Sequence, residues 1–315
     1  MPTLISYAKP LGPSCQQALA SLQLPQLSAL LRLLTPDARI THDEDTLSPL
    51  HEVLQAQALG LTVQDGLVPL AALQAQALHL SGPDADAAWA WLTPCHWQVN
   101  ADHVRMADPV DTQISAEESE QVMDTLRAFL IEDGIALHGL QGGNWLATGK
   151  VFHHLPTASL ARACGGAVDH WLPRQAQAQT LRRLQNELQM LLYSHPVNDA
   201  RAARGLLPIN SFWVSGTGSL PENFQAATDC TFQDTLRAAN LRDDAMAWSQ
   251  AWQALDAGAF TALLQQARRG EPVQLTLCGE SAAQPYTLQP QGLWTRLHQR
   301  LLPGRTDLAA LLQSL

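Results

Sequence analysis

The sequence predicts an α/β fold, with α+β as the alternative, because helical and strand patterns alternate along its whole length. The clearest helix covers 176–195, where one face carries Leu181, Leu184, Leu188, Leu191 and Leu192. The apolar run 209–216 leads directly into glycines, as expected of a buried strand. Because no repeat or low-complexity linker interrupts the chain, we expect a single compact domain over 1–315, with or without a subdomain at about 95–175.

The first part of the chain is predicted to be mainly helical. A short strand at 3–8 precedes a helical segment at 16–36, which Pro25 interrupts because proline cannot donate within a helix. A further helix starts at Ser48 and stops at Gly60, and another covers 68–82.

Hairpins and helices alternate from about residue 95 onward. Hairpins are predicted at 95–108, 135–149 and 273–290. Ser115 and Glu118 have the spacing of a capping box and predict a helix that ends at Gly134. The last part of the chain adds helices, which we expect at 233–258, 260–270 and 292–302.

Composition excludes several classes of partner. Hydrophobic residues make up 46% of the 315 residues, charged residues only 15%, and the net charge is −10. Nucleic-acid binding needs a concentrated basic face, so we expect no nucleic-acid partner. No sufficiently long apolar run predicts a membrane span, and the first residues lack a signal-peptide pattern. Five widely spaced cysteines predict a reducing cytoplasm without disulfides or a cysteine zinc site.

One region carries residues suited to binding a small anion. The helix at 176–195 presents Asn186 and Gln189, and the turn after it carries Asn198, Arg201 and Arg204. The following strand adds Asn210 and Trp213, and we expect a small-residue exit loop at its end, formed by Ser215, Gly216, Thr217 and Gly218. Guanidinium groups bind oxyanions in a bidentate manner, and glycines let backbone amides approach closely. Alternatively, the arginines pair with Asp199 or Glu187 and the glycines only turn the chain.

No pattern of metal ligands or of a serine nucleophile is evident. The sequence has no His-Glu-x-x-His motif and no Gly-x-Ser-x-Gly elbow. The histidines lack the spacing of three or four convergent ligands. We therefore predict no metal and no cofactor, and leave the catalytic residues unassigned.

The segment 181–218, "LRRLQNELQMLLYSHPVNDARAARGLLPINSFWVSGTG", resembles the bacterial "regulatory protein RpfE type" family, which is phosphoglycerate-mutase-like. Asn210, Trp213, Gly216 and Gly218 match an N-x-x-W-x-x-G-x-G turn of the archaeal-type cofactor-independent mutases. This resemblance implies an alkaline-phosphatase-like or reduced mutase-like core with added helices and hairpins. In the mutases it also implies two metal ions, usually manganese, a phosphorylated serine and an aspartate at the end of the first strand.

The sequence departs from that pattern at the catalytic positions. The first strand, in "TLISYAKPLGPS", is followed by no aspartate, since the first aspartate is Asp37. We therefore expect a regulatory or binding protein that lacks the catalytic metal site, with a protein partner or a small anionic ligand. An active phosphatase or phosphomutase is the first alternative, and it would require convergence of His96, His103, His153 and His154 with Asp102, Asp108 or Asp169. A scaffold protein with a tryptophan-rich interface is the second.

Overall fold

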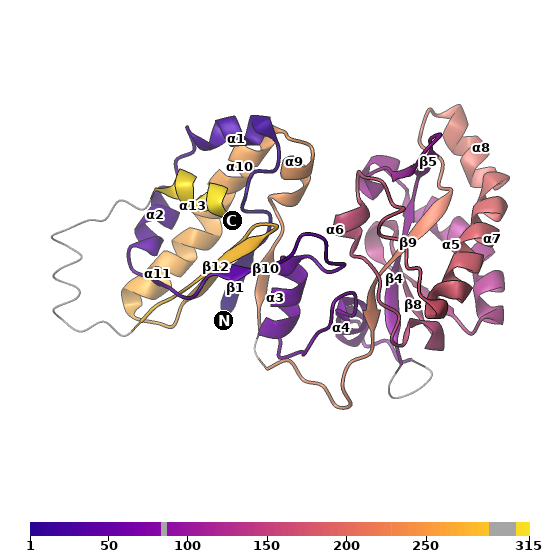
Figure 1. The fold of residues 1–315 in the computed structure, drawn as a ribbon, viewed down its shortest axis with the longest axis horizontal. Coiled ribbons are helices and arrows are strands. Elements are labelled where there is room, and N and C mark those ends of the chain that lie inside the picture. Colours follow the sequence, from indigo (N-terminus) through magenta and orange to yellow (C-terminus); the bar gives the residue numbers. More distant parts are fainter. Residues whose placement is uncertain (83–86, 228, 290–306) are drawn as a thin grey trace. The chain divides into compact units, whose positions relative to one another are not determined.

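The computed structural model describes residues 1–82, 87–227, 229–289 and 307–315 (Figure 1). The helix expected at 292–302 lies outside these residues. No helix of the described chain is long and apolar enough to cross a membrane.

Contacts between Cα atoms divide the chain into two compact units, which are described separately. Unit 1 comprises Met1–Glu44, Val53–Leu61 and Ala226–Leu315. Unit 2 comprises Asp45–Glu52 and Thr62–Gln225, and the subdomain expected at about 95–175 falls within it. Helix α3 (Leu50–Ala58) begins in unit 2 and ends in unit 1.

Unit 1 is built on a mixed sheet. In sheet order its strands are β10 (Thr231–Gln233), β1 (Pro2–Ile5), β11 (Gln274–Cys278), β12 (Ala282–Thr287) and β2 (Thr35–Pro36), and β3 (Ile40–Thr41) also pairs with β12. Strand β1 runs parallel to both β10 and β11, whereas β11 and β12 form the predicted hairpin. The predicted α/β class is confirmed by this mixed sheet and the many helices around it.

Unit 1 also contains helices, some of which pack against one another. They are α1 (Pro13–Leu19), α2 (Pro25–Leu31), α9 (Arg237–Leu241), α10 (Ala245–Leu255), the π-helical turn η5 (Asp256–Phe260), α11 (Thr261–Arg269) and α13 (Leu308–Ser314). Helix α1 packs on α10, and α2 packs on α11 (Figure 1). The predicted interruption at Pro25 is confirmed, because α2 begins at that residue.

Unit 2 is built on a four-stranded antiparallel sheet. In sheet order its strands are β7 (Ala136–Gly139), β8 (Trp145–Thr148), β4 (Trp89–Cys95) and β9 (Ser211–Gly218). A separate two-stranded hairpin consists of β5 (Trp97–Val99) and β6 (Val104–Met106). The hairpins predicted at 95–108 and 135–149 are thus confirmed.

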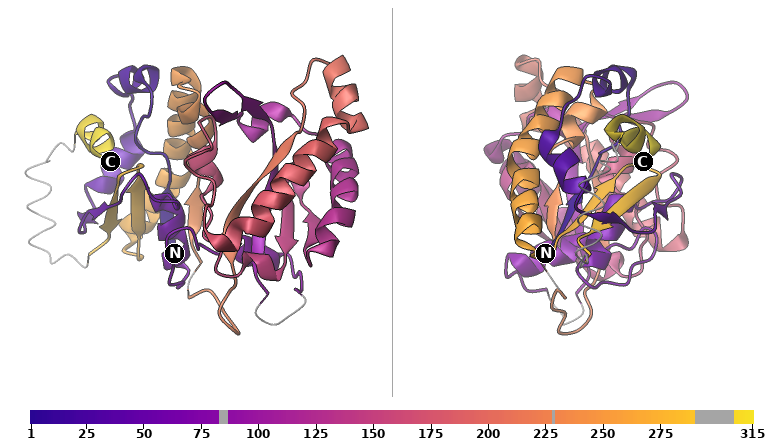
Figure 2. Two further views of the ribbon diagram at one scale, coloured as in Figure 1. Left: turned by 45° about the vertical axis from the view of Figure 1, so that its right-hand side comes forward. Right: turned by 90° about the vertical axis from the view of Figure 1, so that its left-hand side faces the viewer.

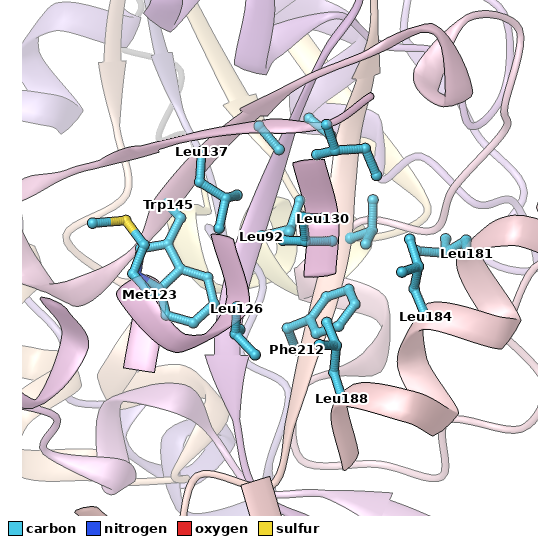
Figure 3. Close-up of a cluster of buried hydrophobic side chains, with 14 of the residues drawn as sticks. Leu92, Met123, Leu126, Leu130, Leu137, Trp145, Leu181, Leu184, Leu188 and Phe212 are labelled. Atoms are coloured by element: carbon cyan, nitrogen blue, oxygen red, sulfur yellow. The ribbon is translucent and has the colours of Figure 1, made fainter. Parts of the chain in front are cut away.

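Helices cover both faces of this sheet. Helices α5 (Ala116–Glu132) and α7 (Gln179–Tyr193) contribute to the main core on one face, and α4 (Leu70–Ala77) packs against the other. Figure 3 shows the main core, in which Leu126, Leu130, Leu184 and Leu188 surround Phe212 of β9. The remaining elements are α6 (Leu160–Ala163), α8 (Pro196–Ala203) and the 3-10 turns η1 (Pro109–Thr112), η2 (Gln141–Gly143), η3 (Lys150–Phe152) and η4 (Ala176–Ala178).

The predicted capping box at the start of α5 is confirmed. The Ser115 hydroxyl accepts the backbone N–H of Glu118, and the Glu118 carboxylate accepts the N–H of Ser115. Two of the N–H groups that a helix start leaves unpaired are satisfied in this way.

Candidate functional site

The residues predicted for an anion site all lie in unit 2, on three consecutive elements or directly beside them. Helix α7 carries Asn186, which is exposed, and Gln189, which is half-buried. Its opposite face packs into the core through leucines (Figure 3). Helix α8 carries Asn198 and Arg201, Arg204 directly follows its last residue, and β9 comes next. Figures 1 and 2 show α7 and α8 as the salmon-coloured elements of this unit.

Arg201 is fully buried, with 0% of its side chain exposed. Its Nε donates to the carbonyl oxygen of Leu207 over 2.8 Å, and Nη1 donates to Glu118 Oε2 over 2.5 Å. The third nitrogen, Nη2, donates to the carbonyl oxygen of Thr112. A buried charge needs such pairing, because an unpaired one costs several kcal/mol. All three nitrogens are thus directed at acceptors within the protein.

Arg204 shares the same carboxylate but lies at the surface. Its Nη2 donates to Glu118 Oε1, and 53% of its side chain is exposed. Burial raises the pKa of the Glu118 carboxyl, but the Ser115 N–H and the two guanidinium groups lower it by more. Its pKa therefore lies below the ordinary value.

The arginines' partner is not one of the two acids considered in the sequence. Asp199 is exposed on α8, and Glu187 pairs with Arg183 over 2.8 Å. Glu118 lies 83 residues before Arg201, beyond the reach of any argument from local spacing. The alternative, in which the arginines pair with an acid of the chain itself, is therefore confirmed. The acid is Glu118, and neither Asp199 nor Glu187.

Two asparagines of the predicted site hydrogen-bond to backbone as a peptide group would. Asn198 Oδ1 accepts the N–H of Ile209, while Nδ2 donates to the carbonyl oxygens of Leu192 and Ile209. Asn210 does the same with Trp97, at 2.7 Å and 2.8 Å. Both amides therefore fix the path of the chain into β9.

The small-residue segment after Trp213 is not an exit loop. Strand β9 continues to Gly218, and Ser215 pairs with Trp91 while Gly218 pairs with Trp89. The pairing thus advances by three residues along β9 and by two along β4, so β9 contains a β-bulge. Gly216 has φ +66°, and a Cβ there would lie 2.7 Å from Trp91 Cε3. The glycine allows the bulge and the close packing of the indole, so the predicted loop is corrected to a bulged strand.

The remaining predicted residues on β9 are buried. The Trp213 indole N–H donates to the carbonyl oxygen of Ala158 over 2.9 Å, and Ser215 is 3% exposed. The Thr217 hydroxyl donates to the carbonyl oxygen of Leu155 over 2.7 Å. This face of β9 consequently contributes to packing against neighbouring segments.

Two helix starts in unit 1 are also occupied by carboxylates of the chain itself. Asp243 accepts the N–H groups of Ser14 and Cys15 at the start of α1, at 3.0 Å and 2.9 Å. Asp256 does the same for Gln26 and Leu27 at the start of α2. Neither helix has a capping side chain from its own preceding residue. These distant aspartates therefore supply the missing acceptors.

The residues present do not fit the two-metal centre that the mutase resemblance implies. Strand β1 is followed by Ser6, Tyr7 and Ala8, none of which carries a carboxylate. Within the described ranges, no group of three or more His, Cys, Asp or Glu side chains is placed to hold a metal ion.

The histidines and aspartates required by the phosphatase alternative are engaged separately. His96 Nδ1 lies 2.9 Å from the Pro208 carbonyl oxygen, and His103 pairs with the neighbouring Asp102 over 2.6 Å. Asp108 caps η1 and Asp169 accepts the N–H of Val104. The ring centroids of His153 and His154 lie 6.0 Å apart, and the two ring planes are tilted by 47° to each other. The convergence that this alternative requires is not found among the described residues.

Comparisons with known proteins give a distant relationship. No family model matches the chain. Over 131 residues it is 29% identical to the 2,3-bisphosphoglycerate-independent phosphoglycerate mutase of Methanosarcina mazei, an alignment that covers 39% of this chain and 32% of that protein. The chain therefore matches about a third of that relative's length.

Two solved structures align with most of the chain. The cofactor-independent phosphoglycerate mutase from Thermoplasma acidophilum aligns over 92% of this chain and 90% of its own, with 12% identity and a TM-score of 0.35. The PH0037 protein from Pyrococcus horikoshii aligns over 91% and 87%, with 12% identity and a TM-score of 0.44. Since both TM-scores are below 0.5, the similarity rests on the aligned sequence. The chain is an α/β protein with distant similarity to cofactor-independent phosphoglycerate mutase.

Sequence reasoning missed three residues that organise this region. Thr112 and Glu118 complete the surroundings of Arg201, and His195 caps α8 through its imidazole. Only Glu118 had a local signal, its capping-box spacing from Ser115. That spacing predicts where the helix starts. It does not indicate that the carboxylate pairs with the two arginines, which lie far away in the sequence.

Proposed function

We propose that the chain is a phosphoglycerate-mutase-like protein of the "regulatory protein RpfE type" that acts by binding and not by catalysis. It would work in the cytoplasm without a metal cofactor. Its ligand would be a protein partner or a small anion.

One observation carries the proposal. The cationic groups that the sequence suggests for a small anion, Arg201 and Arg204, are both bonded to Glu118. A phosphoryl-transfer site needs cations directed at the substrate, because they stabilise the charge that develops in the transition state. Arg201 instead serves the packing of α8 on α5, which supports a role in structure.

An anion could still reach Arg204. Its Nε donates to the carbonyl oxygen of Ala200 and one terminal nitrogen contacts Glu118, while half of the side chain is exposed. Titration calorimetry with inorganic phosphate, comparing the wild type with Arg204→Gln, tests this version. Binding that is lost in the variant supports a retained anion site, whereas equal heats remove Arg204 from the proposal and leave the protein partner.

An active metal-dependent phosphatase or phosphomutase is the second candidate. The sequence match to the Methanosarcina mazei mutase favours it. The tryptophan-rich scaffold has less support, because the described tryptophans are buried or half-buried. The buried ones are Trp89, Trp97, Trp145, Trp213, Trp248 and Trp252.

Metal retention separates the first two candidates. The protein is incubated with excess manganese, desalted and analysed for metal by mass spectrometry, with a cofactor-independent mutase as the positive control. We expect no retained manganese and no interconversion of 2- and 3-phosphoglycerate by phosphorus NMR. Two retained ions per chain with turnover would overturn the proposal and establish the phosphomutase alternative.

A further inference from the structure

The connection between α7 and α8 consists of Ser194 and His195, and the imidazole of His195 makes two hydrogen bonds from a buried position. Its Nδ1 accepts the backbone N–H of Val197 over 3.2 Å, and this contact caps the start of α8. Its Nε2 lies 2.9 Å from the Thr125 hydroxyl oxygen of α5. The side chain thus joins the start of one helix to the middle of another.

The hydrogen-bond chain fixes the protonation state of this imidazole. Because Nδ1 accepts, the single proton of the neutral ring must be on Nε2, which donates to Thr125 Oγ1. The Thr125 hydroxyl in turn donates to the carbonyl oxygen of Gln121 over 3.1 Å. Each donor therefore has an acceptor in one tautomer of the neutral ring, and a second proton on Nδ1 would face the Val197 N–H.

We infer that His195 is a proton-operated latch, which holds the first turn of α8 against α5 when neutral and releases it when protonated. The inference concerns the fold of unit 2 and is independent of whether the chain catalyses a reaction. Burial lowers the pKa of the imidazole below 6.5, as expected for a ring that must stay neutral.

The charged groups on the packed helices do not oppose this effect. Burial is the cause of the lowered pKa. On α5, Glu118 is bonded to Arg201 and Arg204 of α8, and Asp124 pairs with Arg127. On α7, Arg183 pairs with Glu187 and with Asp133.

Release of this latch would affect the path into β9. Helix α8 fixes the following segment through Asn198, which bonds both backbone groups of Ile209, and through Arg201, which bonds Leu207. A loosened first turn of α8 weakens the support of that connection, so acid would change the mobility of a surface made by α8 and the residues after it.

Amide hydrogen exchange followed by mass spectrometry tests the latch on the full chain. Peptides covering 193–210 are compared at pH about 7.5 and about 5, after correction for the intrinsic exchange rate. We expect about fivefold faster corrected exchange at the lower pH, which corresponds to loss of one helix cap. Glu118 stays ionised in this range because its pKa lies below its ordinary value of 4.5.

Two variants make the result specific. His195→Asn keeps a capping acceptor that does not titrate, and its exchange should be the same at both pH values. His103→Asn removes a partly exposed histidine of the β5–β6 hairpin and should leave the pH response as in the wild type. An unchanged wild-type rate, or the same response in His195→Asn, would overturn the latch.

Nitrogen-15 NMR of the wild-type imidazole provides a readout that does not depend on any variant. The neutral ring should show the Nε2–H tautomer at pH about 7.5. A ring with its proton on Nδ1 would contradict the cap and with it the inference.

Discussion

Removing the Glu118 carboxylate should destabilise unit 2 far more than removing any exposed acid of the same helix. In Glu118→Gln the fully buried guanidinium of Arg201 loses its counter-charge. Breaking a buried ion pair by removing one partner costs about 3–5 kcal/mol. The exposed contact to Arg204 adds at most about 1 kcal/mol. We therefore expect a loss of about 3–5 kcal/mol in the free energy of unfolding.

The measurement must follow unit 2 itself, because the two units need not unfold together. Urea unfolding is monitored by amide exchange of peptides from α5 and α8. Glu117→Gln, an exposed acid in the first turn of the same helix, is the matched control and should change stability by no more than about 0.5 kcal/mol. Replacing both partners by apolar residues, in Glu118→Leu with Arg201→Met, should cost less than Glu118→Gln alone.

The pH dependence gives an independent check of the same carboxylate. Its folded-state pKa is lowered, so its contribution is fully present above the ordinary value of 4.5 and is lost as the pH falls through the folded value. The stability difference between wild type and Glu118→Gln should shrink below that pH. A cost below about 1 kcal/mol for Glu118→Gln at neutral pH would refute the reasoning.

The remaining predictions concern the bulge, a distant cap and the latch. Gly216→Ala should lower the free energy of unfolding by about 3 kcal/mol, because strain at positive φ adds to a clash with the Trp91 indole. Gly205→Ala has φ +69° but no atom within 4 Å of the added Cβ, and should cost about 1 kcal/mol. Denaturant unfolding measures both losses. Asp256→Ala should lower the free energy of unfolding by about 1–2 kcal/mol, because α2 loses the acceptor at its start. Replacing the exposed Asp234 by Ala should cost about 0.5 kcal/mol or less in the same unfolding experiment. The pKa of His195 is lower in the folded chain than in the unfolded chain, so below about pH 6.5 the unfolded chain binds more protons than the folded chain. The melting temperature should therefore fall as the pH drops below that value. The fall should be smaller in His195→Asn. Equal costs for the two glycine variants, equal costs for the two aspartate variants, or parallel pH profiles would contradict the respective prediction.

Local patterns in the sequence predict the elements that depend on neighbouring residues. The capping box of Ser115 and Glu118, the helix start at Pro25 and the hairpins are all determined within a few residues, and all are confirmed. The bulge at Gly216 escaped prediction for a different reason. A glycine at positive φ serves a turn and a bulge equally well, so only pairing with β4 distinguishes them.

Contacts between distant residues decide the rest, and no periodicity reports them. Asp256 caps α2 from 229 or 230 residues away, and Glu118 meets Arg201 across 83. Unit 1 combines three separate segments of the chain, which hides its boundary from an analysis of composition. A cation or a helix start in the sequence therefore indicates that an anion is needed, and the fold determines whether the chain supplies it.

The Glu118→Gln variant should itself bind an inorganic anion. When a neutral amide replaces the carboxylate, the guanidinium groups of Arg201 and Arg204 lose the negative charge that both of them contact. Inorganic phosphate that binds the folded variant must stabilise it by mass action, by about 2.7 kcal/mol at a hundredfold excess over the dissociation constant. We expect phosphate to raise the melting temperature of Glu118→Gln more than sodium chloride of equal ionic strength does, and more than phosphate raises that of the wild type. The double variant Glu118→Gln with Arg204→Gln should respond less, because one of the two guanidinium groups is gone. If phosphate and chloride act alike on Glu118→Gln, the arginines serve packing alone, and the predicted anion site has no basis at this position.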